Sequence, residues 1–149
     1  MKKYKNILAC IDLSKISEEV IIRANEIANF YKAHLVILYV NYDMPPLSEP
    51  FGEPASLLLD AELRKKLEER ALQELGNIIL QSGLSELVPV EVIDGHPKTI
   101  ILDYAKKHHI DLILMGRHQR PAILDLLGST ANTVLHKTKA DVLLVTDAN

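Results

Sequence analysis

The sequence predicts an α/β fold in which a five-stranded parallel sheet carries helices on both faces, as a three-layer sandwich. Five short apolar runs, of the kind that buried parallel strands form, are spread along the chain. Stretches with helical spacing or with helix-capping residues separate these runs, which is the alternation typical of parallel α/β domains. The 149 residues suit one domain, which we expect to span residues 1–149.

The first part of the chain is expected to hold two strands with a helix between them. Residues 6–11 and 34–40 are short, continuous apolar runs and predict the strands. Ser14 or Ser17 can cap the helix, and glutamates follow in its first turn. The inward face of this helix is expected to carry Val20, Ala24, Ile27, Ala28 and Tyr31.

The longest helix is predicted over residues 55–81. Four prolines in residues 41–54 indicate a loop before it, and Ser82-Gly83 can end it. Its apolar residues near helical spacing are Leu63, Leu67, Ala71, Leu75 and Ile78.

The last part of the chain is expected to add three strands and two helices. The strands are predicted over residues 88–93, 111–115 and 141–146, and Pro89 favours a sheet edge for the first of them. Residues 94–97 indicate a turn before the next helix. The face of that helix carries Ile100, Ile101, Tyr104, Ala105 and His108. The final helix, residues 129–137, is expected to bury Ala131, Val134 and Leu135.

Charge and composition exclude several classes of function. The net charge of −3 offers no basic surface to nucleic acid or to a membrane. The single cysteine, Cys10, cannot form an internal disulfide, which suits a reducing cytosol. No apolar run approaches the roughly 20 residues of a membrane span, and the start of the chain lacks the core of a signal peptide. We therefore expect a cytoplasmic protein without nucleic-acid or membrane partners.

No catalytic motif is recognisable in the sequence. There is no Ser-His-Asp order, no pair of carboxylates and no His-Glu-x-x-His segment. Cys10 lies inside the first predicted strand and has no identifiable base to activate it. His108-His109 lacks the cysteine or carboxylate partners of a metal site. We expect no catalysis by the chain alone and no bound metal.

The most informative segment is a glycine corner in the last third of the chain. The apolar run of residues 111–115 ends on Gly116, and after a polar loop Gly128-Ser129-Thr130 opens the final helix. Backbone N–H groups and the positive end of a helix dipole favour phosphate at such a corner. The first strand-to-helix turn has no glycine, which excludes a dinucleotide fingerprint or a P-loop there.

Six pieces of the chain, taken together, resemble the universal stress protein family over nearly the whole length. They are residues 5–14, 38–40, 95–97, 111–116, 128–130 and 140–145. The resemblance implies the strand order 3-2-1-4-5, which makes the fifth strand a sheet edge. An apolar edge strand without proline or lysine invites pairing with another chain. Because family members commonly dimerise through this strand, the resemblance implies a homodimer through Val142 to Val145.

The family resemblance also bears on ATP. Members that bind ATP carry Gly, two residues, Gly, nine residues, Gly, then Ser or Thr. Gly116 and Gly128-Ser129 match the ends of this pattern, but Gln119 replaces the middle glycine and residues 120–127 are one residue short. This departure resembles the UspA branch, whose members are generally regarded as not binding ATP. The side chain of Gln119, and a shift of the backbone donors by about 3.5 Å for the missing residue, both oppose phosphate binding. Arg117 and Arg120 could supply compensating positive charge.

If the chain binds ATP or AMP, the resemblance implies a crevice made of eight residues. They are Asp12, Val40, Met115, Gly116, Arg117, Gly128, Ser129 and Thr130. Several have a second interpretation. Asp12 can cap the first helix or its turn, and Val40 and Met115 can be ordinary core residues. The hydroxyls of Ser129 and Thr130 can act as helix N-caps, worth about 1 kcal/mol.

Two functional hypotheses follow. The first is a cytoplasmic, homodimeric stress-response module of the UspA-like branch that acts by interaction rather than by catalysis. The alternative is an adenine-nucleotide-binding sensor or weak ATPase of the same family. The loop from Gln119 to Leu127 is the sequence feature that separates them.

Overall fold

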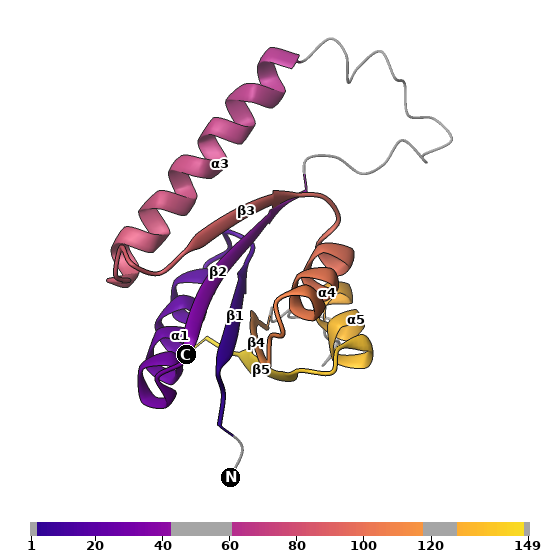
Figure 1. Cartoon of the computed structure of the whole chain (residues 1–149). Coiled ribbons are helices and arrows are strands. Elements are labelled where there is room, and N and C mark those ends of the chain that lie inside the picture. The colour runs from indigo at the N-terminus through magenta and orange to yellow at the C-terminus, as the bar shows by residue number, and fades with distance from the viewer. Residues whose placement is uncertain (1–2, 43–60, 118–127, 148–149) are drawn as a thin grey trace.

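The computed structural model describes residues 3–42, 61–117 and 128–147, and these form a three-layer α/β sandwich (Figure 1). Five strands lie in one sheet in the order β3-β2-β1-β4-β5. Every neighbouring pair is parallel. The predicted fold class and strand order are therefore confirmed.

The strands are short because each one only crosses the core. Their bounds are β1 Asn6–Ile11, β2 His34–Asn41, β3 Val90–Asp94, β4 Leu112–Gly116 and β5 Asp141–Val145. β1 lies in the middle and pairs with β2 on one side and β4 on the other. Five of its six residues are buried, which explains its continuous apolar sequence. The order of strands reverses between β1 and β4, and open α/β sheets bind ligands at this switch point.

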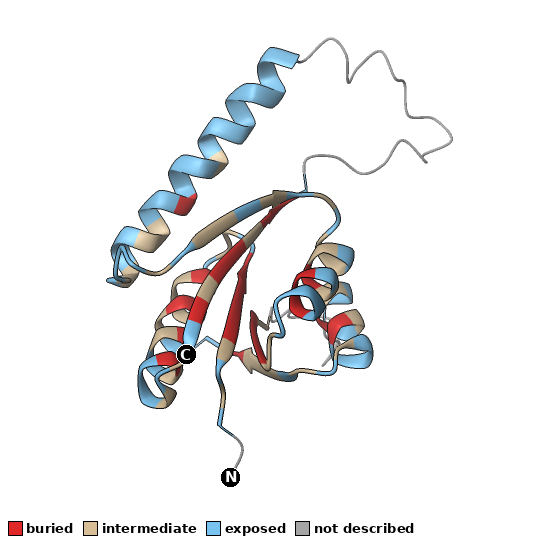
Figure 2. Cartoon of the chain, viewed as in Figure 1, coloured by how far each residue is buried: buried red, intermediate tan, exposed pale blue. Residues whose placement is uncertain are grey.

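Two helices cover each face of the sheet. α1 (Ser17–Tyr31) and α3 (Ala61–Ser82) lie on one side, and α4 (Pro97–Lys107) and α5 (Ser129–Lys137) lie on the other (Figure 1). Apolar side chains from the two faces of the sheet form two separate core clusters, one beneath α1 and α3 and one beneath α4 and α5. Figure 2 shows that burial is concentrated along the central strands and the inner faces of α1, α4 and α5.

The third strand begins two residues later than the sequence predicts. Its expected start at residue 88 is wrong because the N–H of Val88 donates to the carbonyl of Ser85 in a turn, and Pro89 has no N–H to donate. The carbonyl of Pro89 still accepts from Ile37 of β2. The expectation that Pro89 marks a sheet edge is confirmed, since β3 lies at the end of the sheet.

The predicted side-chain caps of two helices are wrong. The N-cap of α1 is Ile16, which makes no side-chain cap bond, and the hydroxyls of Ser14 and Ser17 instead donate to the carboxylate of Asp12. The N-cap of α5 is Gly128, again without a side-chain cap bond, so Ser129 and Thr130 already lie inside the helix.

The long helix α3 packs along only part of its length. Leu75 is buried, but Leu63 and Leu67 are 49% and 52% exposed. Figure 1 shows the beginning of α3 extending past the sheet, which explains why, among the described residues, this part of the helix keeps its apolar side chains exposed. Gly83 follows the helix with φ +71°, a conformation that favours glycine, so the predicted end at Ser82-Gly83 is confirmed. The predicted loop beyond residue 42 and the helix residues 55–60 lie outside the described residues.

Within the described parts of the chain, no helix combines the length and apolarity that a membrane crossing requires.

Candidate functional site

A crevice of about 250 Å³ opens at the carboxyl ends of β1 and β4, where the strand order reverses. All eight residues that the sequence nominated line this one cavity: Asp12, Val40, Met115, Gly116, Arg117, Gly128, Ser129 and Thr130. They come from the ends of three strands and from the start of α5. Folding thus brings together residues that are more than 100 positions apart in the sequence. Gln119, Arg120 and the rest of the shortened loop lie outside the described residues.

The inner wall of the crevice is apolar, and sequence reasoning missed most of it. The additional lining residues are Cys10, Ile11, Ile16, Ser17, Val20, Leu38, Pro97, Ile101 and Ala131. Most of them are core residues whose pattern in the sequence signals burial and nothing more. Val40 and Met115 are 9% and 7% exposed, so they are core residues and crevice-lining residues at once.

Asp12 organises the turn between β1 and α1. Its Oδ1 accepts hydrogen bonds from the backbone N–H of Ser14 at 3.1 Å and from the hydroxyl of Ser14. The hydroxyl of Ser17 donates to the same oxygen at 3.3 Å. The interpretation of Asp12 as a turn residue is therefore confirmed, and its position on the crevice leaves the ligand-binding interpretation in place.

Leu13, between Asp12 and the serines, adopts φ +65°. This left-handed conformation costs a residue with a Cβ roughly 1–2 kcal/mol, and strained backbone of this kind is often found at functional sites. The surrounding contacts must hold the turn in this shape, and the Asp12 hydrogen bonds and the packing of the Leu13 side chain on the core beneath α1 both do so.

Gly116 is needed for close packing. A Cβ built on Gly116 would overlap Cγ2 of Ile16, the N-cap residue of α1. Its φ lies outside the left-handed region, so the requirement for glycine comes from the neighbouring side chain. The sequence places this glycine at a corner that favours phosphate, and the structure supplies a second and independent reason for it.

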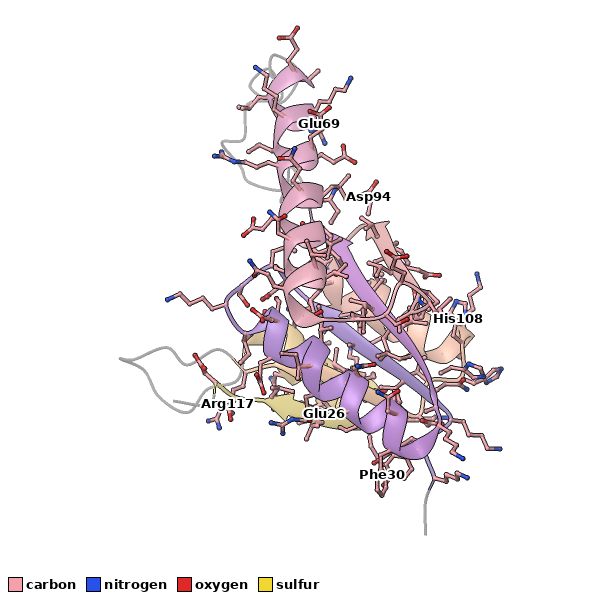
Figure 3. The ribbon with its side chains drawn as sticks, turned by 90° about the vertical axis from the view of Figure 1, so that its left-hand side faces the viewer. Glu26, Phe30, Glu69, Asp94, His108 and Arg117 are labelled. Carbon is pink, nitrogen blue, oxygen red and sulfur yellow. The ribbon has the colours of Figure 1, made fainter. Side chains whose placement is uncertain are left out.

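The start of α5 forms the polar rim of the crevice. Among the residues that the structure describes, none lies within 4 Å of a Cβ built on Gly128. Ser129 and Thr130 occupy the first turn of α5, where backbone N–H groups and the helix dipole favour an anion. Arg117 adds a positive charge to the lining, and its N–H donates to the carbonyl of Val145 at 2.8 Å. Figure 3 shows the Arg117 side chain at the end of the sheet away from Phe30.

The cysteine in the crevice wall is not activated. Burial raises the pKa of the Cys10 thiol far above its usual range, which keeps the thiol protonated at neutral pH. The expectation of a buried, unreactive Cys10 agrees with this environment. Among the residues that the structure describes, no group of three or more His, Cys, Asp or Glu side chains is placed to hold a metal ion.

The wall and the rim of the crevice differ in polarity. One wall is apolar and the rim carries an arginine, two hydroxyls and a helix N-terminus. Such an arrangement suits a ligand with a flat apolar part and an anionic part, and the volume lies near the lower end of small-molecule pockets.

Comparisons with known proteins agree on one family. The sequence model described as "Universal stress protein family" matches residues 3–146. Universal stress protein A homolog 1 of Coxiella burnetii is 36% identical over 148 residues, covering 95% of this chain and 96% of that protein. The universal stress protein UspA from Lactobacillus plantarum superposes with a TM-score of 0.75 at 26% identity, covering 97% of this chain and 99% of that one. A universal stress protein solved in complex with cAMP shares the fold, with a TM-score of 0.62 at 20% identity over 97% of this chain and 98% of that one.

Proposed function

The chain belongs to the universal stress protein family, and from this premise we propose that it is a cytoplasmic stress-response module that works as a homodimer, by interaction rather than by catalysis. The proposed dimer forms through β5, over Val142 to Val145. The observation that carries it is the position of this strand at the end of the sheet, where its only neighbour among the described residues is β4.

The backbone of β5 supports this proposal. The N–H of Asp141 donates to Asp111, and the carbonyl of Val145 accepts from Arg117, so both residues direct their backbone groups toward β4. Because backbone direction alternates along a strand, the backbone groups of Val142 and Leu144 point to the outer edge. A second copy related by a two-fold axis would satisfy these groups in an antiparallel pairing.

The proposed location rests on the chemistry of the single cysteine and on net charge. Cys10 is buried as a free thiol, which suits a reducing compartment. The net charge of −3 gives the chain no general attraction to nucleic acid or to an anionic membrane surface.

The dimer is tested directly by light scattering of the purified protein at micromolar concentration. A mass near twice that of the 16.7 kDa chain supports the proposal. A monomer at that concentration contradicts it. Incubation with ATP and Mg²⁺ over hours, with release of phosphate followed, tests the absence of catalysis. ATP hydrolysis that persists through repeated purification and is lost when Arg117 is substituted would contradict the proposed absence of catalysis.

A second candidate function is the binding of an adenine nucleotide as a regulatory ligand. The observation that favours it is the convergence of all eight nominated residues on one crevice with an apolar wall and an anion-attracting rim. A protein of the same fold has been solved in complex with cAMP, which is itself an adenine nucleotide. A volume of about 250 Å³ suits a mononucleotide better than a dinucleotide.

Two measurements test nucleotide binding. The purified protein is denatured and the supernatant examined by absorbance and mass spectrometry for released ATP or AMP. If none is found, the melting temperature is recorded with and without millimolar ATP and Mg²⁺, because a ligand that binds the native state raises it by mass action. Release of nucleotide or a rise in melting temperature supports the candidate. The candidate is eliminated if no nucleotide is released and the melting temperature does not rise.

A further inference from the structure

The turn between β1 and α1 holds one carboxylate with unusual firmness. Three donors, one backbone N–H and two hydroxyls, converge on the Oδ1 of Asp12. One of these hydroxyls belongs to Ser17, which is 0% exposed and lines the crevice. Asp12 itself is exposed, so it does not need three partners to compensate for burial. The bonds therefore fix where the carboxylate points rather than making its burial tolerable.

The side chain of Leu13 ties the backbone of the same turn to the core. Its φ of +65° is a conformation that glycine adopts readily and that leucine avoids. A glycine would leave the turn free to sample several shapes. Leucine is held in this conformation because its side chain packs against the core cluster beneath α1, which ties the turn to the body of the protein.

We infer that Leu13 and Ser17 are positioning residues, which hold the Asp12 carboxylate at the mouth of the crevice to accept a hydrogen bond from an N–H or O–H group of a bound nucleotide. This inference rests on the second candidate function, the binding of an adenine nucleotide. Leu13 acts through the backbone of the turn, and Ser17 acts through its hydroxyl on Oδ1. Their contribution is preorganisation, which lowers the entropy lost when the ligand binds.

A positioning role and a purely structural role have different effects on nucleotide affinity and on the free energy of unfolding. Removing the Ser17 hydroxyl leaves both donors of Ser14 on Asp12, which is also exposed to water, so we expect the free energy of unfolding to change little. Replacing Leu13 with glycine relieves the left-handed strain, but it also loosens the unfolded chain and removes the side-chain packing on the core beneath α1, so the loss of stability is expected to be larger than for Ser17→Ala. A residue with only a structural role would weaken binding in proportion to stability. A positioning residue weakens binding while the melting temperature stays nearly constant.

The test compares Ser17→Ala and Leu13→Gly with wild type by calorimetric titration with ATP and with AMP. We expect affinity about fivefold weaker in each variant, the size of one lost net hydrogen bond, with the melting temperature of Ser17→Ala within about 3 °C of wild type and both variants folded at the titration temperature. Lys32→Gly is the matched control. Lys32 also adopts a left-handed conformation, with φ +55°, but it is exposed and caps the far end of α1. Unchanged affinity in both crevice variants, or an equal loss in Lys32→Gly, overturns the inference.

A measurement without ligand distinguishes failure of the inference from failure of the nucleotide function. Hydrogen exchange at the N–H of Ser14, which donates to Asp12, is followed by NMR. We expect this N–H to exchange at least about fivefold faster in Ser17→Ala and Leu13→Gly than in wild type, because each substitution lets the accepting carboxylate of Asp12 move more freely. We expect no change in Lys32→Gly. If wild type binds neither nucleotide, the nucleotide function fails and the Ser14 amide alone decides: faster exchange in the two variants supports positioning, and unchanged exchange overturns it.

Discussion

Gly116, at the end of β4, and Ile16, at the start of α1, are packed so closely that a Cβ at Gly116 would overlap Cγ2 of Ile16. The two residues are 100 positions apart in the sequence, and both line the crevice. The glycine that marks the family pattern is thus also a packing requirement of the first helix.

Gly116→Ala is expected to destabilise the protein by about 1–3 kcal/mol, because Ile16 must move to admit the new methyl group. Combining it with Ile16→Ala, which removes the overlapping atoms, is expected to give a loss smaller than the sum of the single losses by about 1–2 kcal/mol. Urea denaturation of the four proteins measures this coupling.

Ile16→Val supplies the control for that cycle, since valine keeps the methyl group that Gly116 meets. Gly116→Ala should be as costly in the Ile16→Val background as in wild type. Full additivity of Gly116→Ala with Ile16→Ala would show that the two side chains do not compete for space.

Cys10 is expected to make stability depend on pH above about 8.5. Burial raises the pKa of the native thiol, so the native state keeps its proton while the unfolded chain ionises near its usual pKa. The native state then binds more protons than the unfolded state, and the free energy of unfolding falls as pH rises. Between pH 9 and 10 this contribution has a slope of about 1.4 kcal/mol per pH unit.

Urea denaturation at several pH values measures this slope, and Cys10→Ala is the matched variant. The variant has a different stability, because it changes the packing in the crevice wall, but the part of the slope due to the thiol should vanish. An identical slope in wild type and variant would mean that the native thiol ionises as readily as in the unfolded chain.

Tyr104 is expected to lose its phenolic proton at a higher pH than an ordinary tyrosine. Burial, together with a hydrogen bond and charge interaction with Glu91, raises the pKa of Tyr104 to about 12. Stability should therefore be insensitive to this residue below pH 10 and should fall between pH 10 and 12, where only the unfolded chain loses the proton. The ultraviolet difference titration of wild type against Tyr104→Phe isolates its phenolate signal.

Glu91→Gln is the companion variant for Tyr104. It removes the negative charge while burial remains, so the pKa should move down but stay above the ordinary value of 10. A Tyr104 that titrates at 10 in wild type would contradict the assigned environment.

Val142→Pro is expected to dissociate the proposed dimer without unfolding the monomer. The N–H of Val142 points to the outer edge of β5, so proline there removes a donor to the second copy and no bond to β4. Light scattering across a concentration series should show a rise in the dimer dissociation constant of at least about tenfold, since one or more backbone bonds and the strand pairing around them are lost.

Val92→Pro is the control on the opposite edge of the sheet. The carbonyl of Pro89 faces β2, so by alternation Val92 also directs its N–H outward, from the other edge strand. The two changes are chemically identical. Equal effects of both variants on dimerisation, or no effect of either, would rule out β5 as the dimer interface.

Most of the fold could be predicted from the sequence because parallel strands leave a strong local signature. A strand buried on both faces, such as residues 6–11 or 112–115, must be apolar throughout, and the helices between strands carry apolar residues at helical spacing. Element ends were less predictable. The starts of α1 and β3 depend on which hydrogen bonds form locally, as when the hydroxyls of Ser14 and Ser17 donate to Asp12.

The sequence predicts the α/β class and the resemblance to the family, and through that resemblance it predicts the eight residues that line the crevice. The tertiary structure decided the rest. It placed Ile16 against Gly116, Ser17 on Asp12 and Cys10 in the crevice wall. The physical reason is that apolar periodicity reports only whether a side chain is buried. Which neighbours it is buried against, and in what geometry, is set by contacts between segments that the chain brings together only on folding.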